Sequence, residues 1–303
     1  MSARLRGLAR DTESIVAAGG YRAPDGREHR IAAAVEAARE GTRVFGPQPV
    51  PAPGPKATAT RTTRIEVTGE SSLQAARRLA SAPARSGSEP AAPGSGTAVL
   101  NFASARNPGG GYLNGAQAQE EALCRASALY TCLLRAPQFY AHHRAHRDPF
   151  YTDRVIHSPA VPVFRDDRGR LLDEPFTTGF LTSPAPNAGV ILRRTPERAA
   201  EIPGALAERA GRVLETASAV GHRRLVLGAW GCGVFRNDPV QVAGAFRALI
   251  GPGGRFAGAF EHVVLAILDR TPAGTTRAAF EDAFAGLADA PEAADHPEAA
   301  ARP

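Results

Sequence analysis

The sequence predicts an α/β fold, with a mixed, mostly parallel sheet flanked by helices and an N-terminal helical extension. One observation is that runs such as AVLNFA (98–103) and HVVLAIL (262–268) are apolar without alternation, which is typical of strands covered on both faces. The other is that segments with helical patterning separate these runs, as the crossovers between parallel strands require. Ligands bind such sheets at the carboxyl ends of the strands. The loops that leave strands are therefore the candidate functional segments.

Helical and strand-like patterns alternate from the N-terminus onward. Helices are expected over residues 4–19, 28–41, 71–80, 117–134, 196–220, 239–250 and 275–287. Strands are expected over residues 64–68, 98–103, 154–160, 177–184, 225–229 and 262–268. The start of the helix over 239–250 is the best defined, because Asp238 is a good N-cap and Pro239 suits the first helical position.

Segments rich in Pro, Ala, Gly and Ser divide the chain. Residues 46–60 and 82–96 have this composition and are expected to be linkers, and the charged stretch 165–176 is expected to form a hairpin tip. We therefore expect an N-terminal helical extension with a Pro-rich linker over 1–60, a catalytic domain over 61–287 and a disordered tail over 288–303.

The composition excludes several classes of protein. Hydrophobic residues make up 43% of the chain and charged residues 22%, which is a globular balance and not that of a disordered or fibrous chain. No apolar run approaches the length of a transmembrane helix, and no apolar segment of a secretory signal follows the basic N-terminus. The three cysteines, Cys124, Cys132 and Cys232, are too few and too scattered for a disulfide framework or a zinc site. We expect a cytoplasmic protein.

The net charge of +6 permits an anionic partner but does not identify one. Only one of the 36 basic residues is a lysine, and no block of five or more basic residues occurs. Proteins that bind duplex nucleic acid usually carry a denser basic stripe. We therefore expect no direct binding to DNA.

The loop after the strand over 98–103 is the first with chemical content. Three glycines, Gly109–Gly111, are followed after seven residues by Gln119, Glu120 and Glu121 at the start of a predicted helix. Glycines let the backbone approach a ligand closely, and their N–H groups can bind an anion. Each half has a plainer explanation, since acidic residues complement a helix dipole and a glycine run can be only a turn. The two together are much more specific than either alone.

The loop after the strand over 225–229 is the second. It reads GAWGCGVFRNDP over residues 228–239, and its glycines precede a helix, so that backbone N–H groups can hold a diphosphate. Phe235 can pack on a sugar or a base. The alternative is an ordinary strand–helix connection with a core phenylalanine. Two such loops at the carboxyl ends of one sheet favour a ligand that carries phosphate.

The stretch 101–121 resembles the signature of poly(ADP-ribose) glycohydrolases, in which GGG is followed after a short spacer by QEE. The N-terminal helices, the SPAPN segment over 183–187 and the GAWGCGVFRNDP loop resemble bacterial-type members of that family. The resemblance runs from about residue 4 to about residue 287, with gaps at the two linkers.

The resemblance implies a macrodomain-like fold that binds the terminal ADP-ribose of poly(ADP-ribose) and hydrolyses the ribose–ribose O-glycosidic bond. It implies that Glu121 is the general acid and that Glu120 hydrogen-bonds sugar hydroxyls near the scissile bond. It also implies that Asn107 and Gly109–Gly111 hold the distal ribose, and that residues 231–235 bind the diphosphate, with Phe235 packing against the distal ribose. The expected substrate-binding residues are Asn107, Gly109, Gly110, Gly111, Gln119, Gly231, Cys232, Gly233, Val234 and Phe235.

The same resemblance implies no metal and no cofactor. The expected partners are poly(ADP-ribose) or ADP-ribosylated proteins, with ADP-ribose as the product. The resemblance to bacterial-type members also implies cleavage from the chain end, since in those members the N-terminal extension is expected to cap the adenosine end of the site. Neighbouring carboxylates cannot easily flank a sugar as the usual pair in glycosidases does. One acid with one orienting carboxylate fits their adjacency better, with water attacking from the far face.

Two other functions remain open from the sequence. One is a macrodomain that binds ADP-ribose without cutting it, although such a module has no need of Glu121. The other is a hydrolase of mono-ADP-ribosylated protein, which would share the contacts to the terminal unit.

Several other residues are expected to be structural. His142, His143 and His146 are expected to form a solvated surface instead of a metal site, because no Cys or acidic partner has suitable spacing. His157 is expected in the core. Cys232 is expected to be a small residue in a tight loop and not a reactive thiol, and Trp230 is expected to pack beneath that loop. Ser158 and Ser183 lack the sequence context of a nucleophilic serine.

Overall fold

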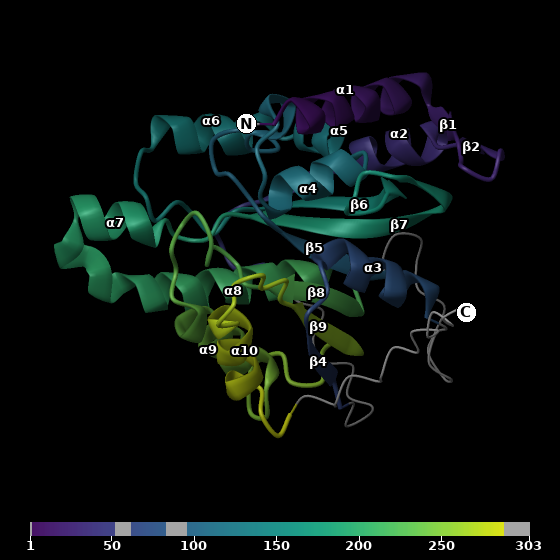
Figure 1. The fold of residues 1–303 in the computed structure, drawn as a ribbon. Coiled ribbons are helices and arrows are strands. Elements are labelled where there is room, and N and C mark those ends of the chain that lie inside the picture. Colours follow the sequence, from purple (N-terminus) through teal and green to yellow (C-terminus); the bar gives the residue numbers. More distant parts are fainter. Residues whose placement is uncertain (1, 52–61, 83–95, 288–303) are drawn as a thin grey trace.

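The computed structural model describes residues 2–51, 62–82 and 96–287. Its centre is a seven-stranded sheet with the order β3-β6-β7-β5-β8-β9-β4 (Figure 1). The five strands from β7 to β4 run parallel, whereas β6 and β3 pair antiparallel at one edge. The strands are β3 (Arg43–Phe45), β4 (Arg64–Thr68), β5 (Thr97–Phe102), β6 (Val155–Arg165), β7 (Leu171–Ser183), β8 (Arg224–Gly228) and β9 (His262–Ala266). The predicted fold class, a mostly parallel sheet flanked by helices, is confirmed.

Helices cover both faces of this sheet. The upper layer in Figure 1 contains α1 (Ala3–Ala18), α2 (Ala32–Gly41), α4 (Gln119–Ala126), α5 (Leu129–Leu133) and α6 (Pro137–Ala145). Two buried clusters reflect the two faces. Val226 of β8 packs with the helices of the upper layer and with α3 (Ser72–Ser81), whereas Leu225 and Leu227 pack on the opposite side. That side is covered by α7 (Ala188–Arg194), α8 (Ile202–Ala219), α9 (Pro239–Ile250) and α10 (Thr275–Ala283).

Several predicted boundaries are wrong, each for a local reason. The helix expected over 28–41 is preceded by a hairpin of β1 (Gly20–Arg22) and β2 (Glu28–Arg30). The helix expected over 117–134 is interrupted at Ser127, whose hydroxyl donates to the Leu123 carbonyl and accepts the Leu129 N–H. The helix expected over 196–220 begins as a 3₁₀ turn over Pro196–Glu201. The short elements β3, α6 and α7 lie outside every predicted element.

The charged stretch 165–176 is a hairpin tip as expected, but most of it belongs to strands. The turn spans only 166–170, where Asp166 accepts the N–H groups of Arg168 and Arg170 and Gly169 adopts a φ of 83°. Most of the two expected linkers, at 52–61 and 83–95, and the expected tail over 288–303 lie outside the described residues. No helix in the described part of the chain is long and apolar enough to cross a membrane.

The N-terminal segment packs directly against the rest of the chain. Strand β3 joins the main sheet by pairing with β6. Helix α1 lies against the loop after β5, because the Tyr112 hydroxyl donates to Glu13 at 2.9 Å and the Ser2 N–H donates to the Gly115 carbonyl at 3.1 Å. The start of α1 is thereby brought to the end of the sheet where the parallel strands terminate.

Candidate active site

A cleft of about 1160 Å³ lies at the carboxyl ends of the parallel strands. Binding pockets for organic ligands commonly enclose roughly 300–1,000 Å³, so the cleft can hold a ligand the size of a dinucleotide. Its walls come from the loops after β5, β8 and β9, the first turn of α3, the start of α1 and the β6–β7 hairpin tip. Both glycine-rich loops singled out in the sequence therefore reach one cavity.

The glycine run of the first loop is shaped around the two glutamates. Gly109 and Gly110 have φ values of 66° and 58°, in the left-handed region that favours glycine. A β-carbon on Gly110 would lie 2.5 Å from Oε1 of Glu121 and 3.0 Å from Oε2 of Glu120. The backbone thus approaches both carboxylates as closely as it does only because no side chain stands between them.

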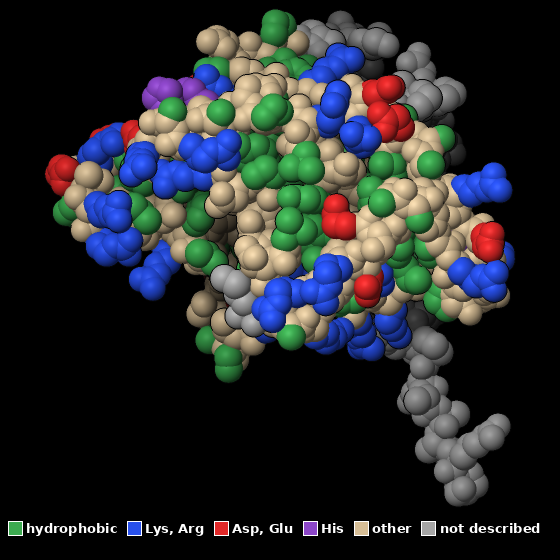
Figure 2. Space-filling model, turned by 90° about the horizontal axis from the view of Figure 1, so that it is seen from above, with side chains coloured by type: hydrophobic (Ala, Val, Ile, Leu, Met, Phe, Trp, Pro, Cys, Tyr) green, Lys and Arg blue, Asp and Glu red, His purple; other side chains and the backbone are tan. Residues whose placement is uncertain are grey.

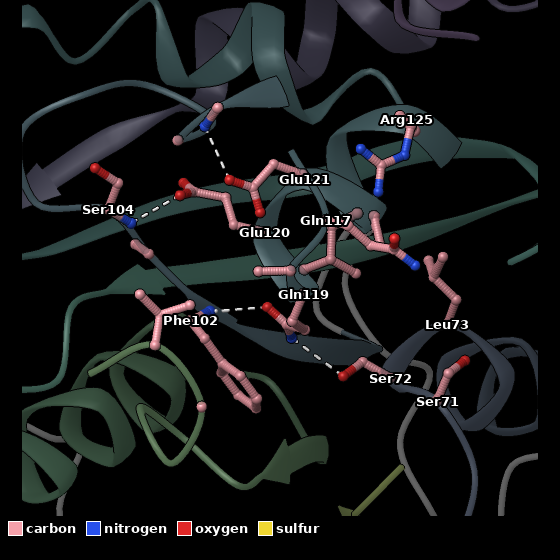
Figure 3. A pocket seen from close by; sticks show the side chains of 18 of the residues that line it. Ser71, Ser72, Leu73, Phe102, Ser104, Gln117, Gln119, Glu120, Glu121 and Arg125 are labelled. Atoms are coloured by element: carbon pink, nitrogen blue, oxygen red, sulfur yellow. Dashed lines mark hydrogen bonds between the residues drawn. The ribbon is translucent and has the colours of Figure 1, made fainter. Parts of the chain in front are cut away.

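Glu120 is almost completely buried, with 2% of its surface exposed. Its Oε2 accepts the N–H of Ser104 at 2.7 Å (Figure 3), and its Oε1 accepts an N–H of the Asn101 side-chain amide at 3.3 Å. Burial raises the pKa of Glu120 to about 8, and the charge of Glu121 acts in the same direction. Glu120 therefore retains its proton at neutral pH in the free protein.

Glu121 lies beside Glu120 and lines the cleft (Figure 3). Its Oε1 accepts the N–H of Gly111 at 2.8 Å. Its Oε2 is buried and has no hydrogen-bond partner among the described residues. A buried oxygen without a hydrogen-bond partner lowers the stability of the fold. This atom is therefore available to form a hydrogen bond with a ligand in the cleft.

Gln119 is the first residue of α4, and both the oxygen and the nitrogen of its side-chain amide form hydrogen bonds within the protein. Its Oε1 accepts the Phe102 N–H at 2.9 Å, and its Nε2 donates to the Ser72 hydroxyl at 3.1 Å and to the Leu100 carbonyl at 2.8 Å. These contacts fix the start of α4 against β5 and α3 (Figure 3). Gln119 borders the cleft, but its amide positions the two glutamates that follow.

The second loop is anchored beneath and free at its tip. Trp230 is buried as expected, and its Nε1 donates to the Ser183 carbonyl at 2.9 Å. Gly231 has a φ of 74°, and an added β-carbon would lie 2.6 Å from that of Ala185. At the tip, Val234 is 80% exposed. The loop therefore presents its backbone to the cleft on a rigid base.

Most of the predicted site residues lie together on the wall of the cleft. The members of both loops that line it are Asn107, Gly110, Gly111, Gln119, Glu120, Glu121, Gly231, Gly233, Val234 and Phe235. Gly109 and Cys232 do not line it. Burial raises the pKa of the Cys232 thiol to about 12, so this side chain stays protonated and unreactive near neutral pH.

Sequence reasoning missed residues whose roles depend on tertiary contacts. Asn101 and Ser104 hold Glu120, although both lie inside the stretch 101–121 that carries the resemblance. Their only sequence signal was their place at the carboxyl end of a buried strand. The remaining contributors to the wall lie far away in the chain and include Arg4, Leu5 and Leu8 of α1, Ser71 and Ser72, Asp166–Gly169, Leu268 and Arg270.

The histidines following α4 do not form one solvated surface. His142 and His146 stack with ring centroids 4.1 Å apart. His143 is fully buried, and its ring nitrogens contact the Phe139 carbonyl and the Thr152 hydroxyl at 2.9 and 2.8 Å. The prediction for His143 was wrong because this face of α6 packs inward. Within the described ranges no group of three or more His, Cys, Asp and Glu side chains could hold a metal ion.

Residues 9–166 match the family described as the catalytic domain of microbial-type PARG, where PARG denotes poly(ADP-ribose) glycohydrolase. The chain belongs to this family. The predicted family and enzyme class, a glycosidase, are thereby confirmed. No curated protein matches the chain at a significant level.

Solved structures of bacterial PARG are similar over most of the chain. One, from Thermomonospora curvata, is 48% identical with a TM-score of 0.84 and covers 93% of this chain and 100% of that chain. The same T. curvata enzyme bound to the inhibitor ADP-HPD is 51% identical with a TM-score of 0.81 and the same coverage. PARG from Deinococcus radiodurans in complex with ADP-ribose is 44% identical with a TM-score of 0.73, covering 84% of this chain and 98% of that chain.

Proposed function

We propose that this PARG removes terminal ADP-ribose units from poly(ADP-ribose), with Glu121 as the general acid that protonates the leaving ribose oxygen. The observation that carries the proposal is the state of Glu121 in a cleft of this size. One carboxylate oxygen is fixed by the Gly111 N–H, and the other is unpaired. The ADP-ribose and ADP-HPD complexes of related PARGs support a ligand of this class.

The contacts of the two carboxyl groups suggest where the retained proton resides. Both oxygens of Glu120 accept N–H groups, which favours the ionised form of that side chain. Oε2 of Glu121 accepts none. We therefore infer that the proton passes from Glu120 to Glu121 when the substrate fills the cleft, and that ionised Glu120 then accepts hydrogen bonds from the ribose hydroxyls.

The reaction then begins with protonation of the leaving ribose oxygen. Glu121 gives its proton to the leaving oxygen as the bond to the anomeric carbon breaks, which leaves an oxocarbenium-like ribose. The diphosphate, held by residues 231–235, lies near this centre and stabilises it. Water attacks the anomeric carbon from the face opposite the glutamates and releases its proton to a diphosphate oxygen or to solvent.

The start of α1 supports cleavage from the chain end. Arg4, Leu5 and Leu8 line the cleft, and the Arg4 guanidinium donates to the Arg168 carbonyl of the hairpin tip at 2.7 Å. These contacts close one side of the cleft, and we place the adenosine there. A polymer threaded through that end would have to displace them.

The free thiols of Cys124, Cys132 and Cys232 support a reducing, cytoplasmic setting.

Product release from purified poly(ADP-ribose) tests the proposal, with wild type beside Glu121→Gln and Glu120→Gln. Wild type should release ADP-ribose, and Glu121→Gln should lose about 10²–10⁴-fold in rate while keeping its Kd for ADP-ribose. Tight binding without release by wild type would indicate a reader or a hydrolase of mono-ADP-ribosylated protein. Release by Glu121→Gln at the wild-type rate would remove Glu121 from the role of acid.

A further inference from the structure

An aromatic and basic strip leads away from the cleft beside Phe235. The Phe235 ring, on the wall of the cleft, lies 6.0 Å between centroids from the Tyr151 ring. The guanidinium carbon of Arg106 lies 5.9 Å from the centre of that ring. We refer to Phe235, Tyr151 and Arg106 as the Tyr151 strip. Arg106 directly precedes Asn107, another wall residue, so the strip is continuous with the cleft at both of its ends.

Tyr151 is held in a backbone conformation that is unfavourable for a bulky side chain. Its φ is 60°, in the left-handed region. The N–H of Tyr151 donates to the Asp148 carbonyl at 3.2 Å, and its ring meets the ring of buried His143 nearly edge-on at 5.9 Å. Conformations of this kind persist where the surroundings enforce them and concentrate at ligand-binding positions. The half-buried ring is thus fixed in place before any ligand arrives.

The strip carries positive charge that the protein does not neutralise. The Arg106 Nε donates to the His143 carbonyl, and the Arg144 guanidinium donates to the Arg106 carbonyl at 2.7 Å. Neither arginine forms an ion pair with any described residue. Figure 2 shows basic side chains gathered close to the histidines on the face seen from above.

The neighbouring carboxylates do not offset this charge. Asp148 pairs with Arg198 at 3.3 Å, and Asp153 pairs with the buried Arg209 at 3.0 Å. Both aspartates are therefore already engaged by other cations. An anion that approaches the strip meets arginines with donors to spare.

We propose that the Tyr151 strip binds the ADP-ribose unit on the leaving side of the scissile bond, with its adenine on Tyr151 and its diphosphate near Arg106 and Arg144. This rests on the proposed function. The leaving oxygen belongs to the adenosine ribose of that unit, so only this ribose separates its adenine from Glu121. The adenine therefore lies at the edge of the cleft that Phe235 and Asn107 form. Aromatic rings stack on bases of any sequence, and arginines pair with phosphates. Free ADP-ribose, which ends at the distal ribose, reaches Phe235 but neither Tyr151 nor Arg106.

The test compares a polymer with the monomer. We would measure kcat/KM for poly(ADP-ribose) and Kd for ADP-ribose in wild type, Tyr151→Ala, Tyr151→Phe and Arg106→Ala. Arg30→Ala, an exposed arginine in β2 at the opposite end of the molecule (Figure 1), is the matched control. Tyr151→Ala and Arg106→Ala should lower kcat/KM about 10- to 100-fold and leave Kd unchanged. Tyr151→Phe and Arg30→Ala should match wild type in both.

Equal losses in kcat/KM and in affinity for ADP-ribose in Tyr151→Ala would overturn the proposal, because they would mean that Tyr151 only supports Phe235. Unchanged kcat/KM in both alanine variants would overturn it as well. If wild type released no ADP-ribose, the proposed function would fail by itself. The strip would then be tested by binding in the Glu121→Gln protein. The quantity to measure is the ratio of Kd for a poly(ADP-ribose) oligomer to Kd for ADP-ribose. Adding Tyr151→Ala should raise this ratio about 10- to 100-fold.

Discussion

Gly110 and Glu121 are in such close contact that a β-carbon at position 110 would stand 2.5 Å from Oε1 of the carboxylate. The glycine run and the glutamate pair are therefore one structural unit. The left-handed φ of 58° at Gly110 turns the chain so that the next N–H, that of Gly111, points at the same oxygen. This contact explains in physical terms why the two halves of the motif occur together.

Gly110→Ala should therefore disable the site while leaving the fold intact. The added methyl group would displace Glu121, and a displacement on the order of 1 Å can cost about 10²-fold in rate. Gly253→Ala is the control, because Gly253 also has a positive φ of 75° but nothing within 4 Å of an added β-carbon. We would measure kcat and the Tm of both. Similar losses of Tm with a loss of kcat only in Gly110→Ala are expected, and wild-type activity in Gly110→Ala would contradict the structure.

The buried carboxyl group of Glu120 should make stability depend on pH. Burial raises its pKa from 4.5 to about 8 on folding, so between these values the folded protein holds a proton that the unfolded chain has released. The free energy of unfolding contributed by this group should fall as the pH rises through that window. Glu120→Gln removes this effect. Between pH 5 and pH 9, the free energy of unfolding of wild type should therefore fall by at least ~1.4 kcal/mol more than that of Glu120→Gln, which is the value of one pKa unit.

Urea denaturation at the two pH values measures this difference. The control is Glu281→Gln, which changes an exposed glutamate on α10 that pairs with Arg277 and should show no such difference between the two pH values. A Glu120→Gln protein whose stability parallels that of wild type at both pH values would show that Glu120 is ionised in the free enzyme.

Gln119 should affect activity only by holding the start of α4, and with it the two glutamates, in place. Gln119→Ala removes three hydrogen bonds that join α4 to β5 and α3, each worth about 0.5–1.5 kcal/mol. Loss of these bonds lets the start of α4 shift, so both Tm and kcat should fall. Gln117→Ala is the matched control, since Gln117 also lines the cleft but is exposed. Equal behaviour of the two variants would show that the Gln119 amide does not position the glutamates.

Much of this arrangement could be read from the sequence because it depends on local patterns. Apolar runs without alternation gave the parallel strands, and the glycine run with its glutamates gave the cleft wall. The rest depends on contacts between distant segments. Ser127 ends α4 while bridging to Val163 of β6, and β3 is too short to be recognised without its partner strand. No local pattern distinguishes buried His143 from stacked, accessible His142 one residue earlier.

The closure of the cleft by α1 leads to the last prediction. Arg4 and Leu8 of α1 both lie against the turn over 166–170 of the hairpin. Arg4 donates to the Arg168 carbonyl, and Leu8 lies close enough to Gly169 that an added β-carbon would stand 2.7 Å from its methyl group. The double variant Arg4→Ala/Leu8→Ala should loosen this closure and admit internal units of the polymer. Oligomers should then appear beside ADP-ribose among the early products, separated by anion-exchange chromatography. Arg10→Ala, on an exposed position of α1, should release ADP-ribose alone, as wild type does. If the double variant also released only ADP-ribose at an undiminished rate, preference for the chain end would have to come from another wall of the cleft.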